Sequence, residues 1–91
     1  MHIDEIIVDN RMRKDLGDID HLVISIKENG LIQPILLTAV SENDLTHYRL
    51  VAGHRRLEAL RKLGVVELNH AEHYLFREEL RDDEYRRTAL E

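Results

Sequence analysis

The sequence predicts a single α+β domain whose elements follow the order β-α-β-β-α-β, with a trailing C-terminal helix. The chain has 91 residues, of which 43% are hydrophobic, which is enough for one modest core. Its apolar residues switch between strand-like runs and helix-like spacing. Glycine or proline separates most of these segments. We therefore expect one domain over residues 1–91.

The first third of the chain predicts a strand, a loop and a helix. Residues 2–8, HIDEIIV, indicate a short strand, and the polar segment 9–18 indicates a loop. Asp18 is placed to cap the start of the helix, and Gly30 is placed to end it. Apolar residues recur on one helical face between them, at Ile19, Leu22, Val23 and Ile26.

A hairpin is predicted next. Residues 34–40, PILLTAV, begin with the only proline, which a strand accepts at its first position. The polar segment 41–47 predicts the turn, and residues 48–52, YRLVA, predict the returning strand.

The remaining residues predict a second helix, an extended segment and a third helix. The second helix is expected at about 54–63, because Leu57, Leu60 and Leu63 fall on one side and Gly64 is a stop signal. Residues 65–76 are expected to be extended. Residues 81–91, RDDEYRRTALE, indicate the start of a third, acidic helix. The acids and arginines of residues 77–87 alternate at helical spacing, which indicates a solvated, salt-bridged face.

Composition and charge exclude several classes of function. The chain has no cysteine, so it has no disulfide framework, thiolate zinc site or thiol nucleophile. No apolar run approaches the length of a membrane span, and we expect a cytoplasmic protein without a membrane partner. Residues 49–62 hold five bases and one acid, although the whole chain has a net charge of −5. One small basic patch suits a small anion better than a DNA duplex.

The segment AGHRR within this patch predicts where that anion binds. Gly53 ends a strand and lets the backbone approach a ligand closely. Arg55 and Arg56 then add two guanidinium forks to the positive end of a helix, which favours a phosphate. On these residues alone, an equal alternative is that both arginines are solvated and pair with Glu58 or with the C-terminal acids.

A metal site is the other candidate that the residues suggest. His70 and His73 flank Glu72 at ligand-like spacing. In an extended segment the two imidazoles point to opposite faces, and no second cluster completes a site. We therefore predict hydrogen-bonded or solvated histidines and no metal site.

Two longer motifs, SIKENGLIQPILL and YRLVAGHRRLEALRKLG, resemble in order and spacing the N-terminal domain of the ParB family. The resemblance covers almost the whole chain and implies the small mixed sheet of the ParB/sulfiredoxin fold. It also implies a nucleotide site, which in partition ParB proteins holds CTP with magnesium. The implied phosphate-binding turn consists of Gly53, His54, Arg55 and Arg56. The implied base and sugar region consists of Gly30, Gln33 and Pro34.

The same resemblance has consequences for the loop and for the partners. It makes Arg11 and Arg13 candidate anion contacts, against the alternative of a surface loop without a ligand. In the family, nucleotide state opens or closes a clamp around DNA, and a following helix-turn-helix domain reads the DNA site. We therefore expect an excised regulatory domain whose full-length protein is a homodimer, binds DNA and associates with nucleoid or plasmid.

Enzyme activity is left open by two departures from the family. Most partition ParB proteins have glutamate at the position of His54. The family motif thought to hold magnesium and support CTP hydrolysis would follow residue 91. Sulfiredoxin chemistry is excluded because it needs a thiol. The alternatives are a stand-alone phosphotransferase- or nuclease-like enzyme of the same fold, or a protein-interaction domain that does not bind nucleotide.

Overall fold

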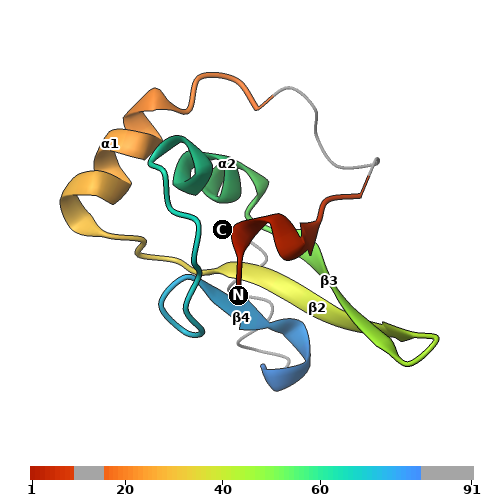
Figure 1. Ribbon diagram of the computed structural model, residues 1–91. Coiled ribbons are helices and arrows are strands. Elements are labelled where there is room, and N and C mark those ends of the chain that lie inside the picture. Colours follow the sequence, from red (N-terminus) through yellow and green to blue (C-terminus); the bar gives the residue numbers. More distant parts are fainter. Residues whose placement is uncertain (10–15, 81–91) are drawn as a thin grey trace.

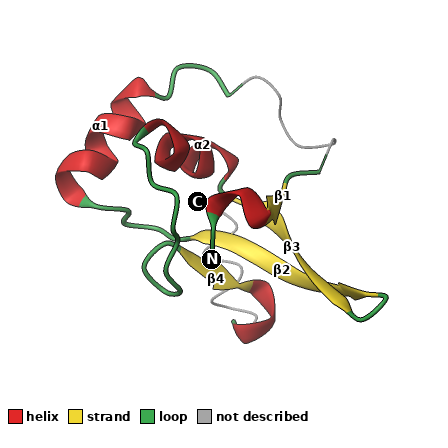
Figure 2. Cartoon of the chain, viewed as in Figure 1, coloured by secondary structure: helices red, strands yellow, loops and turns green. Residues whose placement is uncertain are grey.

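The computed structural model describes residues 1–9 and 16–80, in which two helices pack on one face of a four-stranded mixed sheet (Figures 1 and 2). The strand order is β1-β3-β2-β4, with the β2 and β3 pair antiparallel and the two outer pairs parallel. This arrangement confirms the predicted α+β class and element order. The strands are β1 (Ile6–Ile7), β2 (Ile35–Glu42), β3 (Leu45–Ala52) and β4 (Tyr74–Phe76).

Helices α1 (Asp20–Asn29) and α2 (His54–Lys62) lie close to their predicted positions. Gly30 ends α1 as predicted, and its N–H donates to the oxygen of Ile26 at 2.8 Å. The residue at the start of the helix is Ile19 rather than the predicted Asp18, although Oδ1 of Asp18 accepts the N–H of Asp20 at 2.9 Å. Each large apolar side chain that the helices bury contributes about 1.5–3 kcal/mol to folding. The core joins both helices to the sheet through Ile26, Leu57, Leu60, Ile35, Leu37 and Leu50.

The N-terminal strand is much shorter than predicted. Residues Ile3–Glu5 form a 3₁₀ turn, and only Ile6 and Ile7 pair with the sheet. Nδ1 of His2 accepts the N–H of Asp4 at 3.1 Å, while the Glu5 carboxylate accepts the N–H of His2 at 2.6 Å. These side chains occupy N–H groups that an extended strand would offer to its neighbour, which explains why the strand prediction was wrong for residues 2–5.

The hairpin is longer than predicted because its turn is only two residues. Asn43 and Asp44 have φ values of 51° and 65°, a geometry that matches the twist of the flanking strands. Pairing continues out to Glu42 and Leu45, inside the segment predicted as a turn. The tip of β2 and β3 projects beyond the short outer strands (Figure 1).

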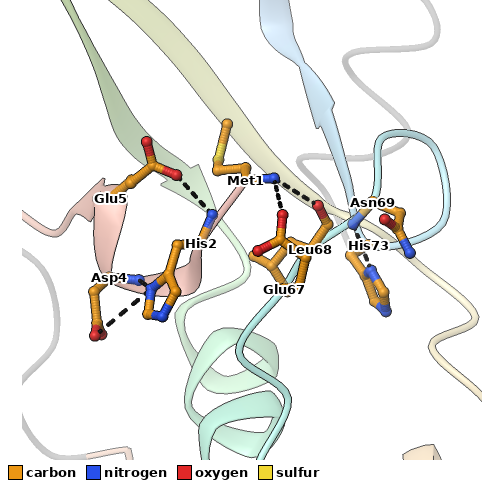
Figure 3. A network of polar contacts seen from close by, with 8 residues as sticks. All are labelled: Met1, His2, Asp4, Glu5, Glu67, Leu68, Asn69 and His73. Atoms are coloured by element: carbon orange, nitrogen blue, oxygen red, sulfur yellow. Dashed lines mark hydrogen bonds and ion pairs between the residues drawn. The ribbon is translucent and has the colours of Figure 1, made fainter.

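Polar contacts hold the chain after α2 against the N-terminus and close a turn within it (Figure 3). The Met1 ammonium donates to Oε1 of Glu67 at 2.8 Å and to the oxygen of Leu68 at 3.1 Å. The hydrogen bond and the charge of this ammonium lower the pKa of Glu67 below its ordinary value. Nδ1 of His73 accepts the N–H of Asn69 at 2.8 Å and closes a turn. A predicted extended segment therefore becomes a turn followed by a strand.

The prediction of a third helix at 81–91 falls outside the described residues. Residues Arg77–Glu79 form a short 3₁₀ turn after β4. Within residues 1–9 and 16–80, no helix combines the length and the apolar character that a membrane crossing requires.

Candidate functional site

The corner between β3 and α2 requires a glycine. Gly53 has φ 95° and ψ 32°, in the left-handed region. A Cβ atom at this position would lie 3.0 Å from Cγ2 of Ile35 and 3.3 Å from its Cα, and Ile35 is fully buried in β2. Only a residue without a side chain therefore lets β3 turn into α2 this close to β2.

The first turn of α2 is electrostatically suited to an anion. Its first main-chain hydrogen bond runs from the N–H of Leu57 to the oxygen of Gly53 at 2.9 Å. The N–H groups before Leu57 lie beyond the reach of intrahelical bonds, and Gly53 provides no side chain to cap them. The first turn also contains no acid that would neutralise the positive end of the helix dipole.

Arg55 is exposed at this helix start, and its contact is with a carbonyl. Its Nη2 atom donates to the backbone oxygen of Asp18 at 3.1 Å. The bases at the other end of α2 meet carboxylates instead: Arg61 bonds Asp4 at 2.7 Å, and Lys62 lies 3.3 Å from Asp20. Within the described residues, the positive charge of Arg55 is therefore not matched by a carboxylate.

The pairing of Arg55 with Glu58 that the sequence allowed is not formed. Glu58 lies 3.4 Å from Nε of Arg61 and 3.9 Å from Nε2 of His54. Glu58 therefore lies between His54 and Arg61 and makes no ion pair with Arg55.

Arg56 is half-buried and points toward the segment before β2. Its Nη1 atom donates to the backbone oxygens of Gln33 at 3.2 Å and Pro34 at 3.0 Å. The structure therefore brings two of the residues expected near the base and sugar next to the expected phosphate-binding turn.

His54 has hydrogen-bonding capacity that the described residues do not use. Its Nδ1 atom is buried and has no hydrogen-bond partner among residues 1–9 and 16–80. Its Nε2 atom is 3.9 Å from Oε1 of Glu58, which is too long for a hydrogen bond. A buried polar atom without a partner costs about 1–3 kcal/mol, and such atoms are rare in folded proteins.

Gly30 lies in a separate feature. It ends α1 with φ 79° and lines a groove of about 570 Å³ between the C-terminal ends of the two helices. Leu60 and Leu63 also line this groove, one and two turns beyond Arg56 along α2. The structure thus groups Gln33 and Pro34 with the phosphate turn and sets Gly30 farther along the helix. The role of Gly30 near the base and sugar stays a prediction. The predicted anion contacts Arg11 and Arg13 fall outside the described residues.

The histidines considered for a metal site have hydrogen-bonding partners of their own. Nε2 of His70 lies 2.8 Å from Oε1 of Glu79, and Nε2 of His73 lies 3.1 Å from Oε2 of Glu72. In the part of the chain that the structure describes, no three histidine, aspartate or glutamate side chains converge on a metal position.

Sequence reasoning missed the acceptors that hold the two arginines. The backbone oxygen of Asp18 was not anticipated, although the Asp18 side chain was expected at a helix start. Every residue carries a carbonyl, so the sequence holds no signal for which one a guanidinium selects. The groove was also missed, because it forms only when the ends of two helices meet.

Comparison with known proteins supports the resemblance in the sequence. The family model of the ParB N-terminal domain matches residues 1–90. A search of curated proteins returned no match. The match spans nearly the whole chain, and the small mixed sheet with two helices agrees with it. The chain therefore belongs to the ParB N-terminal domain family, a family of partition and DNA-binding proteins.

Proposed function

We propose that this chain is a nucleotide-binding regulatory domain of a ParB-like DNA-binding protein and that its ligand is CTP with magnesium. The phosphates bind at the glycine-led corner before α2. The observation that carries the proposal is the exposed guanidinium of Arg55 beside a helix start without a side-chain cap or an acid. Backbone N–H groups, the helix dipole and a guanidinium fork together favour a phosphate.

The choice of CTP comes from the family resemblance, and the donor set at the corner fits its phosphates. Magnesium usually binds through substrate phosphates, waters and one or two carboxylates rather than through a complete protein cage. We therefore expect magnesium to enter with the nucleotide and to show little affinity for the chain alone.

The partners of the full-length protein follow from family membership. We propose that it is a cytoplasmic homodimer associated with nucleoid or plasmid, acting in partition or in transcription regulation. In this proposal DNA is read by another domain, and the nucleotide state of this domain controls that binding.

The test is ligand-induced stabilisation of this chain. CTP with magnesium should raise the melting temperature, because a ligand that binds only the folded state adds about 2.7 kcal/mol at a concentration of 100 Kd. CTP should stabilise the chain more than ATP, GTP or UTP at equal concentrations. Replacing both Arg55 and Arg56 with alanine should abolish the shift. Replacing Arg61 and Lys62, two bases at the opposite end of α2, should retain it.

The outcomes separate the three classes of function. A shift that survives loss of both first-turn arginines would reject the phosphate site. Turnover of a nucleotide or a phosphorylated small molecule by this chain would favour the enzyme alternative. No shift with any nucleotide would favour the protein-interaction alternative.

A further inference from the structure

Three aromatic side chains and one imidazole form a ring cluster on the sheet. Phe76 is at its centre, because its ring centroid lies 5.6 Å from that of Tyr48 and 5.4 Å from that of Tyr74. The imidazole of His70 stacks near Phe76, with 6.2 Å between centroids and 24° between ring planes. Tyr74 is buried, whereas Tyr48 and Phe76 are half-buried and His70 is exposed. The cluster therefore presents ring surface to solvent, and the negative face of an aromatic ring attracts a cation.

The register of the sheet explains how rings from two strands that are not neighbours meet. Tyr48 on β3 is paired with Ala39 on β2, and Phe76 on β4 is paired with Leu37 on β2. Paired residues point to the same face of a sheet, as do residues two apart along one strand. The two rings therefore meet across β2 beside Ala39, whose methyl group leaves room for their contact.

Two exposed carboxylates lie near these rings. Glu79 follows β4, and its two carboxylate oxygens are 2.8 Å and 2.9 Å from Nε2 of His70. Glu5 belongs to the N-terminal 3₁₀ turn, and its carboxylate accepts only the backbone N–H of His2. Burial raises the pKa of Tyr74, and the negative charges of Glu79 and Glu5 raise it further, so both charges act on the ring cluster. Within residues 1–9 and 16–80, neither carboxylate pairs with a lysine or an arginine.

We propose that the ring cluster, together with Glu5 and Glu79, is a docking site for an arginine side chain of a protein partner. A guanidinium stacks on an aromatic face and binds a carboxylate through two parallel hydrogen bonds, so both kinds of group favour it. The same carboxylates repel phosphates, which disfavours a nucleic acid as the partner here. The ring cluster is built from other elements than the corner before α2, so this proposal does not depend on nucleotide binding.

The test is an NMR titration of the whole chain with two blocked peptides. One peptide carries two arginines separated by glycine, and the other carries two lysines in the same places. The arginine peptide should shift the resonances of Phe76 and His70 and bind about fivefold more tightly than the lysine peptide. The reason is that a guanidinium lies flat on a ring and bonds a carboxylate bidentately, whereas an ammonium does neither.

Three variants locate the binding. Phe76→Leu keeps β4 apolar but removes the central ring, and it should weaken the arginine peptide about threefold. Glu79→Gln keeps an oxygen that accepts from His70 but removes the charge, and it should weaken binding by a similar factor. Glu28→Gln, at an exposed position of α1, makes the same change in net charge and should leave binding unchanged. Resonances of Leu60, in the core, report whether a variant has altered the fold.

Four results would overturn the proposal. If the two peptides bind equally tightly, or if Glu28→Gln weakens binding as much as Glu79→Gln, the attraction is only that of the net negative charge. If Phe76→Leu binds the arginine peptide as tightly as the unmutated chain, the rings take no part. If the Phe76 resonances shift on dilution without peptide, a second copy of the chain covers the rings. Shifts with a short single-stranded oligonucleotide, and none with the arginine peptide, would assign the cluster to nucleic acid instead.

Discussion

Gly53 lies so close to Ile35 that a Cβ atom on the glycine would be 3.0 Å from Cγ2 of the isoleucine. This contact sets the separation between the end of β3 and the start of β2. It also fixes the start of α2, whose first turn carries the candidate phosphate site. Core packing and the proposed ligand site therefore depend on the same missing side chain.

Gly53→Ala should destabilise the chain by about 2–4 kcal/mol, since it adds left-handed strain to a steric clash. Gly64→Ala is the matched control: Gly64 also has a positive φ, 82°, but a Cβ there would meet nothing within 4 Å. The control should lose only about 1 kcal/mol. Urea unfolding of both variants measures the difference, and equal losses would show that the contact with Ile35 is relieved by movement.

Glu67→Gln should reduce folding stability at neutral pH and should change how that stability varies with pH. The Met1 ammonium lowers the pKa of Glu67 from the ordinary value of 4.5, so the pair stabilises the fold above that value. The stabilisation is lost as pH falls through the lowered folded pKa. Melting temperatures from pH 7 to pH 3 should therefore converge for the original chain and the variant. Glu42→Gln, at the exposed end of β2, is the control. If the melting temperatures of Glu67→Gln and of the original chain changed in parallel with pH, the pairing of Glu67 with the Met1 ammonium would not stabilise the fold.

Leu57→Ala should cost about 2–5 kcal/mol, because Leu57 is fully buried where α2 meets the sheet. Leu45→Ala provides the comparison, since Leu45 is 62% exposed near the hairpin tip and should change stability by no more than about 0.5 kcal/mol. Chemical denaturation measures both. A small loss at Leu57 would mean that α2 is not anchored by this core.

Ala71→Gly should stabilise the chain by about 0.5 kcal/mol. Ala71 has φ 73°, and the left-handed strain that glycine relieves exceeds the entropy that glycine costs. The same substitution at Ala39, an exposed position in β2, should instead destabilise by roughly 0.5–1 kcal/mol. Thermal unfolding should show a higher melting temperature for Ala71→Gly and a lower one for Ala39→Gly. A lower melting temperature for both variants would show that left-handed strain at Ala71 does not exceed the entropy cost of glycine.

Helical elements were predicted well and extended ones less so, for a physical reason. The spacing of Ile19, Leu22, Val23 and Ile26 is a local signal that one helix face satisfies by itself. Strand limits depend on which neighbour supplies the hydrogen bonds. The capping by His2 and Glu5 shortened β1, and the two-residue turn at Asn43 lengthened the hairpin.

The sequence by itself determined the order of the elements, the family and the placement of two arginines after Gly53 at the start of α2. These features follow from local spacing and from residue types, which can be read along one chain. Only the tertiary structure decided that Arg56 bonds the oxygens of Gln33 and Pro34 while Arg55 remains exposed. That difference depends on which backbone groups folding brings within hydrogen-bond distance, and backbone groups are the same at nearly every position of a sequence.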